Sequence, residues 1–499
     1  MCNILLLTGN RVMCDILLND KTMGGKAVVD RILMIVSDTV RWDMLGYNGG
    51  GVRTPNLDRL AARSMVFDRY YASSFPTVPA RYDYLTGKPA FAGVGWGALP
   101  RADRSIATAL TEVGYTTLGV VDTPFYQVNG YSYDRGFNYF YDMKSQLLGT
   151  PHYSSYSAPN KTKRQGGGKL PQWPITGKVQ PDPRTGEMDC PAPITMVQAA
   201  KCLEQIYEDK FFALVDTWDP HEPWDPPAYY TRHYLPDYAG ERVHPPYGEC
   251  KKHGMTDRDI AVARALYSGE LELVDRWIGH LLDQVAYLGI EDSTAIIFVS
   301  DHGFLLGEHG LMGKMVRRAP GEATWMRSPL YEEIARVPLL IHVPGAKPGR
   351  TSKLACALDI APTVCDMAGL PRQPEMQGLS LLPGVLGQAF EGRDHVLTAL
   401  PLANPGDTVE VVDDLMRTVV EWQPVTITTQ DWSLLYATAS EPVELYDLRT
   451  DPKQTTNVAA KHPEIVTKLL EFYAEDLRRA GVTKKYSEPR LAGSLKAAS

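Results

Sequence analysis

The sequence predicts an α/β fold built on a mainly parallel central sheet, with a smaller antiparallel subdomain towards the C-terminus. The first observation is a set of short apolar runs, rich in valine and isoleucine, which is typical of strands buried on both faces. The second is that helical patterns lie between these runs, so strand and helix alternate over the first three-quarters of the chain. The third is a change after about residue 380, where short strand-like runs follow one another.

Five apolar runs are expected to form strands of the central sheet. They occupy residues 32–36, 117–121, 211–215, 295–299 and 337–343. Amphipathic helices are expected between them, at 194–207 and 260–288. In the first helix, Val197, Ala200 and Leu203 recur at helical spacing and form one apolar stripe.

Three segments do not follow this alternation. Residues 1–30 precede the first regular strand and are expected to be an added extension. Residues 144–193 lack periodicity, and a long insertion of this kind is usually a lid or a partner surface, or else disordered. A second irregular insertion is expected at 315–329.

The last part of the chain is expected to form the smaller subdomain. Short strands are predicted at 395–399, 417–421, 432–436 and 443–448, followed by a helix at 463–480. The expected organisation is therefore a main domain at 31–380 and an α+β subdomain with a tail at 381–499.

Composition and charge exclude several classes of function. The chain has 499 residues, 44% of them hydrophobic, and a formal net charge of −8. An acidic chain without basic blocks is not expected to bind nucleic acid. No apolar run approaches a membrane span and no signal peptide is evident, so a soluble, cytoplasmic protein is expected. Seven widely spaced cysteines without a CxxC pair indicate buried reduced thiols.

Two of the predicted strands end in the same way. Asp38 follows the first strand after one serine, and Asp301 follows a later strand after one serine, with His302 directly behind it. Ligands of open α/β sheets bind at the carboxyl ends of strands. One strand-end aspartate is more often a helix cap, but two carboxylates and an imidazole at one edge favour a divalent metal.

A hydroxyl and a guanidinium lie at a predicted helix start. Thr77 comes just before Pro79 in the first turn, and Arg81 follows one turn later. The positive end of the helix and the arginine together favour an anionic tetrahedral group. An N-terminal cap with a surface arginine would explain the same two residues, and in isolation would be the better explanation.

Two further side chains follow later strands. His221 lies in a Pro-rich loop and is a candidate general acid for a leaving alkoxide. A histidine that bonds a loop carbonyl is an equally good interpretation of His221 alone. Lys314 ends the glycine-rich loop that begins at Asp301 and is expected to act as a point charge.

Taken together, these residues give the chain a resemblance to the sulfatase branch of the alkaline phosphatase superfamily. The matching pieces occur in family order and cover roughly residues 31 to 460. They are Ile-Val-Ser-Asp at 35–38, Thr-Pro-Asn-Leu-Asp-Arg-Leu-Ala at 54–61, Pro-x-Arg at 79–81 with Leu-Thr-Gly at 85–87, His-x-Pro at 221–223, the loop 300–314, Leu-Tyr-Glu-Glu at 330–333 with Arg-Val-Pro-Leu at 336–339, and Glu-Leu-Tyr-Asp-Leu at 444–448 with Asp-Pro at 451–452. The resemblance implies an alkaline-phosphatase-like sandwich, one divalent cation and hydrolysis through a covalent intermediate.

The residue at the start of the family motif departs from the pattern. Sulfatases carry a cysteine or serine there, which is oxidised to formylglycine, and this chain carries Thr77. Threonine cannot be oxidised to an aldehyde, because its Cβ bears a methyl group. The resemblance therefore implies that Thr77 attacks directly or positions a water. Related phosphatases and phosphodiesterases use a threonine or serine alkoxide, usually with two zinc ions.

The metal ligands depart from the pattern as well. The resemblance assigns Asp38, Thr39, Thr77, Asp301 and His302 to one metal ion. Thr39 stands where sulfatases commonly have a second aspartate, and its neutral oxygen is a weaker ligand. A second metal needs an Asp-x-x-x-His element, which neither Asp216 nor the other candidate aspartates provide. One divalent cation, either Ca, Mn, Mg or Zn, is therefore expected.

A pair of cations that contact sulfate in the family is also missing. The family's Gly-Lys-Trp-His element has Asp122 in place of the lysine and Pro124 in place of the histidine. Phosphonate and phosphodiester hydrolases of this branch also lack that pair.

The preferred interpretation is a metal-dependent esterase for a phosphodiester, a phosphonate monoester or a related small anionic ester. The metal and the helix start favour ionisation of the Thr77 hydroxyl, Arg81 and Lys314 hold the non-bridging oxygens, and His221 protonates the leaving group. A sulfate-ester hydrolase is the alternative, and a binding protein that has lost catalysis is a third. The sequence does not set the oligomeric state, so a homo-oligomer stays open.

The second insertion is expected to contribute to substrate binding, because it follows Lys314 directly. Arg317 and Arg318 are the candidate contacts to an anionic substrate, and their removal should weaken binding more than turnover. Solvated surface loops are the alternative, and for 144–193 the two interpretations are nearly balanced.

Overall fold

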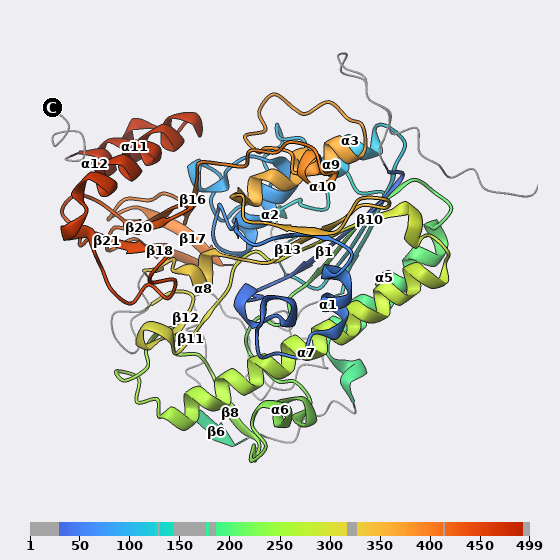
Figure 1. Ribbon diagram of the computed structural model, residues 1–499, viewed down its shortest axis with the longest axis horizontal. Coiled ribbons are helices and arrows are strands. Elements are labelled where there is room, and N and C mark those ends of the chain that lie inside the picture. The colour runs from blue at the N-terminus through green and yellow to red at the C-terminus, as the bar shows by residue number, and fades with distance from the viewer. Residues whose placement is uncertain are drawn as a thin grey trace, which may run out of the picture.

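An eight-stranded sheet runs through the middle of the molecule (Figure 1). The computed structural model describes residues 29–124, 126, 130–143, 176–178, 186–316, 327–412 and 415–492. In spatial order the strands are β14 (Gly349–Thr351), β2 (Met65–Phe67), β13 (Leu339–His342), β10 (Thr294–Val299), β1 (Arg31–Ser37), β7 (Phe211–Thr217), β4 (Thr116–Val121) and β5 (Tyr139–Asp142). All five apolar runs singled out in the sequence form strands of this sheet.

The sheet is mainly parallel, as predicted. Strand β1 pairs in parallel with β10 and β7, and β4 pairs in parallel with β7 and β5. Strand β13, formed by the apolar run at 337–343, instead runs antiparallel to both β10 and β2. A strand buried on both faces has the same composition in either direction, so the sequence pattern could not show this reversal.

Helices cover both faces of the sheet, and alternate residues of each strand face opposite layers. Leu33 and Ile35 of β1 belong to one apolar cluster, and Met34 and Val36 belong to the other. The first cluster packs against α1 (Pro55–Ala61), α5 (Pro191–Ile206), α6 (Ala228–Tyr234) and α7 (Asp257–Tyr287). The second packs against α2 (Thr77–Thr86), α3 (Ile106–Thr111), α9 (Ile360–Met367) and α10 (Leu382–Val385) (Figure 1). The strands therefore read as continuous apolar runs because both faces are covered.

A separate antiparallel sheet follows towards the C-terminus, as expected. Its strands in spatial order are β16 (His395–Ala399), β19 (Val425–Thr429), β20 (Trp432–Tyr436) and β21 (Glu444–Asp447). The run predicted at 417–421 instead contributes to β18 (Leu415–Thr418), which forms a hairpin with β17 (Thr408–Val412). Strand β19 was missed by the sequence analysis. The predicted C-terminal helix is α11 (Pro463–Arg479), and α12 (Lys484–Leu491) follows it.

Smaller elements complete the described fold. They are the pair β3 (Tyr70–Tyr71) with β15 (Ala355–Cys356), the pair β6 (Thr176–Lys178) with β8 (Glu241–Val243), the sheet β11 (Leu305–Leu306), β12 (Leu311–Gly313) and β9 (Gly248–Glu249), and α8 (Glu332–Ala335). Residues 1–28 and most of the insertion predicted at 144–193 lie outside the described residues. Helix α5 begins at Pro191, inside the predicted insertion.

The described cysteines agree with the expectation of reduced thiols. Cys190, Cys202, Cys250, Cys356 and Cys365 are free and buried, and the other two cysteines lie outside the described residues. Among the described helices, none combines the length and apolar character that crossing a bilayer requires.

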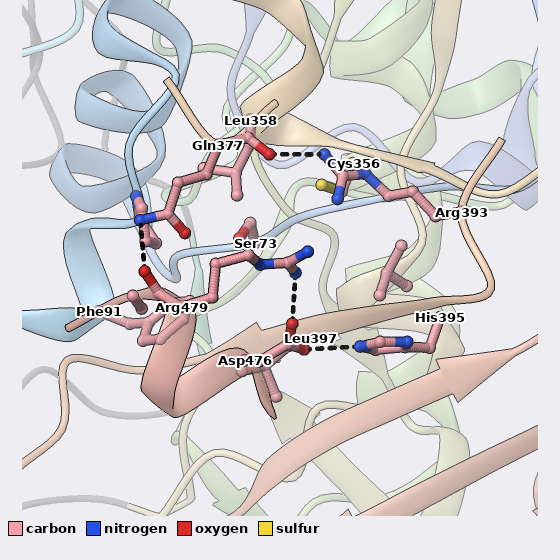
Figure 2. Close-up of a pocket in the computed structure, with 13 residues that line it drawn as sticks. Ser73, Phe91, Cys356, Leu358, Gln377, Arg393, His395, Leu397, Asp476 and Arg479 are labelled. Atoms are coloured by element: carbon pink, nitrogen blue, oxygen red, sulfur yellow. Dashed lines mark hydrogen bonds and ion pairs between the residues drawn. The ribbon is translucent and has the colours of Figure 1, made fainter. Parts of the chain in front are cut away.

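A pocket lies where α11 meets the main layer, and its lining includes the ion pair of His395 and Asp476 (Figure 2). His395 of β16 bonds Asp476 of α11, with 2.9 Å between Nε2 and Oδ2. Arg393 bonds Asp359 with 3.0 Å between Nε and Oδ2, and the two side chains are 8% and 0% exposed. Asp359 also accepts the backbone N–H groups of Cys356 and Leu379 at 2.9 Å and 2.6 Å. The Arg393–Asp359 pair therefore ties β15, the start of α9 and the segment leading into the C-terminal sheet together.

We expect Arg393→Met to lower the free energy of unfolding by about 3–5 kcal/mol, because the Asp359 carboxylate would stay buried without its cation. The matched control is Arg372→Met, which removes an arginine 44% exposed and paired with Asp366. That surface pair should contribute less than about 1 kcal/mol. Urea unfolding of both variants checks the prediction, and equal losses in the two would contradict it.

Candidate active site

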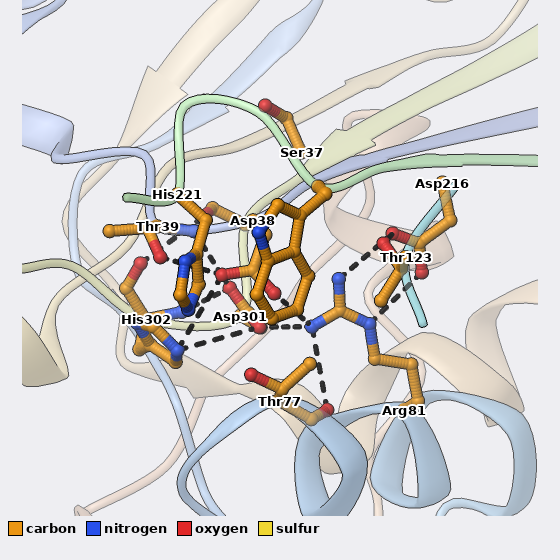
Figure 3. A network of polar contacts seen from close by, with 12 residues as sticks. Ser37, Asp38, Thr39, Thr77, Arg81, Thr123, Asp216, His221, Asp301 and His302 are labelled. Carbon is orange, nitrogen blue, oxygen red and sulfur yellow. Dashed lines mark hydrogen bonds and ion pairs between the residues drawn. The ribbon is translucent and has the colours of Figure 1, made fainter. Parts of the chain in front are cut away.

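Four neighbouring parallel strands carry an aspartate near or just after their ends, at the same edge of the sheet. Val36 of β1 lies opposite Val299 of β10 and Asp216 of β7, and Val121 of β4 lies opposite Asp216 as well. The next acidic residues after these positions are Asp38, Asp301 and Asp122. The predicted meeting of Asp38 and Asp301 is therefore found, and Asp216 joins them (Figure 3).

Asp38, Asp301 and His302 form a buried group of metal-ligand type. Their ligand atoms lie within 4.8 Å of one another, and all three residues are 0% exposed. His302 Nδ1 lies 3.0 Å from the Gly303 carbonyl oxygen, which places the ring proton on Nδ1. His302 Nε2 then faces the two carboxylates, at 3.7 Å from each. Burial lowers the pKa of His302 to about 3, so the imidazole is neutral and can act as a ligand.

The two carboxylates are in an environment that favours a cation between them. Burial and the neighbouring Asp301 raise the pKa of Asp38. Burial would also raise the pKa of Asp301, but the Arg81 guanidinium lowers it. Arg81 Nη1 bonds both carboxylates, at 3.1 Å from Asp38 Oδ2. Two hard oxygen ligands and one neutral imidazole fit a divalent metal ion such as Mn²⁺ or Zn²⁺.

Thr39 holds both carboxylates from the turn that follows β1. Its backbone N–H donates to Asp301 Oδ1 at 3.0 Å, and its hydroxyl donates to Asp38 Oδ1 at 2.6 Å. The residue has φ of 63°, a left-handed conformation that is costly for a β-branched side chain. Its carbonyl accepts the Tyr267 hydroxyl at 2.9 Å. Thr39 thus lies at the predicted metal site, where its hydroxyl bonds a ligand carboxylate.

Thr77 and Arg81 lie one turn apart on α2, beside the two carboxylates (Figure 3). Thr77 is the first residue of the helix and is 1% exposed. The Arg81 guanidinium donates to Asp216 through Nε at 2.9 Å and through Nη2 at 2.8 Å. Most of its donors therefore bond carboxylates of the protein, and a contact from Arg81 to substrate stays a prediction.

Asp216 is a site residue that the sequence analysis missed. Besides Arg81, it accepts the hydroxyls of Thr123 and Tyr126, each at 2.6 Å. From the sequence, Asp216 is a candidate only for a second metal site, which would need a histidine four residues on, and none is there. The signal that could have found it is the aspartate near the end of β7, which matches the strand ends at Asp38 and Asp301.

His221 and Lys314 form a second buried pair at this edge. Lys314 Nζ lies 2.5 Å from His221 Nε2 and 3.4 Å from His302 Nε2. His221 Nδ1 lies 2.7 Å from the Glu222 carbonyl oxygen, and the ring stacks on Trp218 with centroids 3.7 Å apart. Burial, and then the Lys314 ammonium, lower the pKa of His221, so the imidazole is neutral. The structure therefore brings His221 and Lys314 together within reach of the metal-ligand group.

Three further residues named from the sequence are Asp122, which replaces the family's lysine, and the candidate substrate contacts Arg317 and Arg318. Asp122 points into the protein, where it accepts the hydroxyls of Thr195 and Thr217 at 2.7 Å and 3.1 Å, and burial raises its pKa to about 7. Arg317 and Arg318 lie outside the described residues. The nearest described residues, Val316 and Arg327, pair in an antiparallel bridge.

Comparison with known proteins agrees with the resemblance. A profile of the family described as Sulfatase matches residues 30–370. The choline-sulfatase of Rhizobium meliloti is 31% identical over 208 residues, which are 41% of this chain and 35% of that protein. The Arylsulfatase of Clostridium perfringens is 25% identical over 461 residues, covering 86% of this chain and 89% of that one. For the choline-sulfatase and two mammalian Arylsulfatase K proteins, the matched segment spans 35% to 44% of the relative's length.

Solved structures share the fold. The phosphonate monoester hydrolase SpPMH from Silicibacter pomeroyi has a TM-score of 0.69 at 22% identity, covering 92% of this chain and 96% of that one. An identity this low concerns the fold alone. The predicted α/β fold with a smaller C-terminal antiparallel sheet is confirmed.

Proposed function

Because the chain belongs to the sulfatase family, we propose that it is a metal-dependent hydrolase of phosphonate monoesters, phosphodiesters or related singly charged esters. In the reaction one P–O bond breaks, water supplies the new oxygen on phosphorus, and an alcohol leaves with one proton. The observation that carries this proposal is Thr77, which occupies the family's formylglycine position as the buried first residue of α2. A threonine there cannot provide an aldehyde hydrate, so its own hydroxyl, or a water that it holds, must attack the ester.

The described residues fit one divalent cation. Asp38, Asp301 and His302 would hold it; the Thr39 hydroxyl bonds Asp38, and Thr77 lies beside Arg81, which bonds both carboxylates. When bound, the cation would supply positive charge that favours an ionised hydroxyl and stabilises charge in the transition state. Thr77 sits at the positive end of α2, which supports the same ionised form.

Formal charges support a singly charged substrate. The three carboxylates of Asp38, Asp216 and Asp301 face the cations of Arg81 and Lys314, which leaves one negative charge. A divalent cation would turn this into one positive charge as long as Thr77 keeps its proton. A phosphodiester, a phosphonate monoester and a sulfate monoester each carry one negative charge, whereas a phosphate monoester carries up to two. The cluster therefore favours singly charged esters over phosphate monoesters, because buried charge must be balanced.

The leaving oxygen can be protonated by the pair of Lys314 and His221. With His221 Nδ1 donating to the Glu222 carbonyl, Nε2 accepts a hydrogen bond from the Lys314 ammonium at 2.5 Å. The shared proton lies on the Lys314 ammonium, because burial and the ammonium lower the pKa of His221, and it can pass from this pair to the departing alkoxide. Lys314 is 4% exposed, so its charge is poorly screened by water and acts on the reacting group.

We expect Lys314→Met to lower kcat by about 100- to 1,000-fold with a smaller change in KM, because its charge acts mainly in the transition state. The matched control is Lys353→Met, which removes a lysine that is exposed to solvent and is not part of the proposed site. Steady-state kinetics on a substrate that the wild type cleaves check the prediction. An unchanged kcat would remove Lys314 from the proposed mechanism.

A sulfate-ester hydrolase is the second candidate, because the family profile and the curated relatives carry sulfatase names. A binding protein without catalysis is the third, and the intact group of Arg81, His221, Lys314 and the metal-type ligands speaks against it.

We also propose that residues 31–380 form the catalytic domain and that 381–499 form the smaller subdomain. A cytoplasmic location and a homo-oligomeric state stay predictions.

A panel of four p-nitrophenyl esters tests the proposal. Purified protein would be stripped of metal, loaded separately with Mn²⁺, Zn²⁺, Ca²⁺ or Mg²⁺, and assayed on a sulfate, a phosphate, a phosphodiester and a phosphonate. The proposal expects the phosphonate or the phosphodiester to give the highest kcat/KM with one of these metals. Fastest cleavage of the sulfate would favour the second candidate, and binding without cleavage of any ester would favour the third.

We expect Thr77 to be unmodified in the active protein. Mass spectrometry of the peptide that contains it should show ordinary threonine, because its Cβ cannot form an aldehyde. Co-expression with a formylglycine-generating enzyme should therefore leave activity unchanged. A gain in activity from that co-expression would contradict the assignment of Thr77.

A further inference from the structure

The indole ring of Trp218 lies flat against the imidazole of His221. The two ring centroids are 3.7 Å apart and the ring planes differ by 27°. Both side chains are buried, and the backbone N–H of His221 also donates to the Trp218 carbonyl oxygen at 2.9 Å. The indole therefore covers one face of the imidazole and restricts its rotation.

The direction of this imidazole matters, because its two nitrogens have different partners. The ring lies beside the central carboxylates of the site (Figure 3). Its Nδ1 lies 2.7 Å from the Glu222 carbonyl oxygen, and its Nε2 lies 2.5 Å from Lys314 Nζ. Hydrogen bonds weaken steeply when they are bent, so a ring that turned would weaken both contacts together. A stacked indole favours the one orientation in which both are made.

Asp122 fixes the position of Trp218 from the neighbouring strand. It directly follows β4 and is 1% exposed. Its Oδ1 accepts the backbone N–H of Trp218. Its Oδ2 accepts the hydroxyls of Thr195 and Thr217 at 2.7 Å and 3.1 Å. Loss of this buried acceptor would leave the Trp218 N–H without the bond that holds it, at a cost to the local conformation.

The residue after Trp218 is held as well. The carbonyl oxygen of Asp219 accepts the Ser37 hydroxyl at 2.7 Å, and its Oδ2 accepts the backbone N–H of Ala192 at 3.2 Å. Ser37 is the last residue of β1, and Ala192 belongs to the first turn of α5. The backbone that leads to His221 is therefore anchored to two elements, and the indole then sets the direction of the ring.

We propose that Trp218 and Asp122 are positioning residues for the pair of His221 and Lys314: Asp122 fixes the backbone at Trp218, and the indole holds the imidazole with Nε2 directed at Lys314. The inference rests on the proposed function, in which this pair gives a proton to the leaving oxygen. Both residues act through His221 and not on the substrate itself. A misplacement of about 1 Å can cost about 100-fold in rate.

Two phosphonate esters that differ in their leaving group test this role on the metal-loaded full-length protein. They are p-nitrophenyl phenylphosphonate and phenyl phenylphosphonate. The p-nitrophenolate ion is a weak base and can leave without a proton, whereas phenolate is a stronger base and depends on one. The measured quantity is the ratio of kcat/KM for the p-nitrophenyl ester to that for the phenyl ester. This ratio does not depend on the fraction of folded protein, so a variant that is merely less stable leaves it unchanged.

Trp218→Leu should raise this ratio at least about tenfold, because proton donation contributes about 100- to 10,000-fold to such reactions. The matched control is Trp277→Leu on α7, which removes another tryptophan that meets a histidine ring, that of His280, at 5.4 Å between centroids. The control should keep the wild-type ratio. An unchanged ratio in Trp218→Leu would overturn the inference.

Asp122→Ala should raise the ratio in the same direction, because it removes the acceptor that holds Trp218. Asp122→Asn keeps an oxygen that can accept the same N–H and should bring the ratio back towards that of the wild type. The matched control is Asp275→Ala, which removes a buried carboxyl that accepts the backbone N–H groups of Leu57 and Asn56 at 2.8 Å and 3.1 Å. A wild-type ratio in Asp122→Ala would overturn the role of Asp122.

A wild type that cleaves neither phosphonate would mean that the proposed function itself has failed. The ratio is then measured on the sulfate esters of the same two phenols, with the same outcomes expected. If no ester is cleaved, proton NMR of the His221 ring decides, since a stacked indole shifts its carbon-bound protons upfield. Asp122→Ala should move these signals downfield by loosening the stack, and Asp275→Ala should not. Unchanged His221 signals in Asp122→Ala would overturn the inference.

Discussion

Replacement of Asp301 with asparagine is expected to abolish tight binding of a divalent cation and to lower kcat/KM by at least about 1,000-fold. Asp301 lies in the buried group with Asp38 and His302, and it also accepts the backbone N–H groups of Thr39 and His302 at 3.0 Å and 2.8 Å. Asparagine keeps the shape and one carbonyl oxygen, but it lacks the charge that a divalent cation needs. Loss of a residue that merely orients a ligand already costs about 10- to 100-fold in affinity or activity, so loss of a ligand should cost more.

Metal content after dialysis, measured by inductively coupled plasma mass spectrometry, and steady-state kinetics check this prediction together. Asp283→Asn is the matched control, since Asp283 is 58% exposed and pairs with Arg59 at 3.6 Å on the helix surface. The control should bind one metal ion per chain like the wild type. If Asp301→Asn also kept one tightly bound metal ion, the metal site would have to be assigned to other residues.

Replacement of Thr77 with alanine is expected to lower kcat by at least about 1,000-fold, because removing an attacking group usually leaves only the contribution of binding and electrostatics. Thr77→Ser keeps the hydroxyl at the start of α2 and should stay within about tenfold of the wild type. Serine lacks the methyl group that restricts the threonine side chain, so its hydroxyl is less well oriented. The contrast between alanine and serine separates the loss of the hydroxyl from a disturbance of the helix start.

Kinetics of both variants on one phosphonate ester give this contrast directly. Acid quenching during turnover, followed by mass spectrometry of the Thr77 peptide, distinguishes the two roles left open for the hydroxyl. An attached phosphonyl group would show that Thr77 attacks, and its absence under rapid turnover would favour a hydroxyl that positions water. Thr77→Ala with nearly full activity would remove Thr77 from the reaction altogether.

Much of the fold was predictable because the central strands are buried on both faces. The continuous apolar runs at β1, β4, β7, β10 and β13 all mark strands of the sheet. The direction of β13 was not predictable, because direction is set by the connections and partners of a strand rather than by its composition. Strand β19 was missed since its five residues, Val425–Thr429, include three threonines and resemble a polar loop.

The metal-type group was predictable because it depends on a rule of topology. Parallel strands bring their carboxyl ends to one edge, so Asp38 and Asp301 had to meet once their strands were neighbours. The bond network of Asp216 was not predictable, because it depends on side-chain directions of Arg81, Thr123 and Tyr126 in three dimensions. The left-handed turn at Thr39 could not be expected either, since a threonine rarely adopts that conformation.

The measurement that tests the central claim most directly is a competition between two esters in one solution. Equal concentrations of p-nitrophenyl phenylphosphonate and p-nitrophenyl sulfate would be mixed with metal-loaded protein whose Thr77 peptide has the mass of unmodified threonine. The early ratio of released phenylphosphonate to released sulfate equals the ratio of the two kcat/KM values and does not depend on the fraction of active protein. The account predicts that phenylphosphonate is released faster than sulfate, because Thr77 stands at the family's formylglycine position and cannot supply an aldehyde hydrate. Faster release of sulfate would contradict it and would identify the chain as a sulfate-ester hydrolase that works without formylglycine.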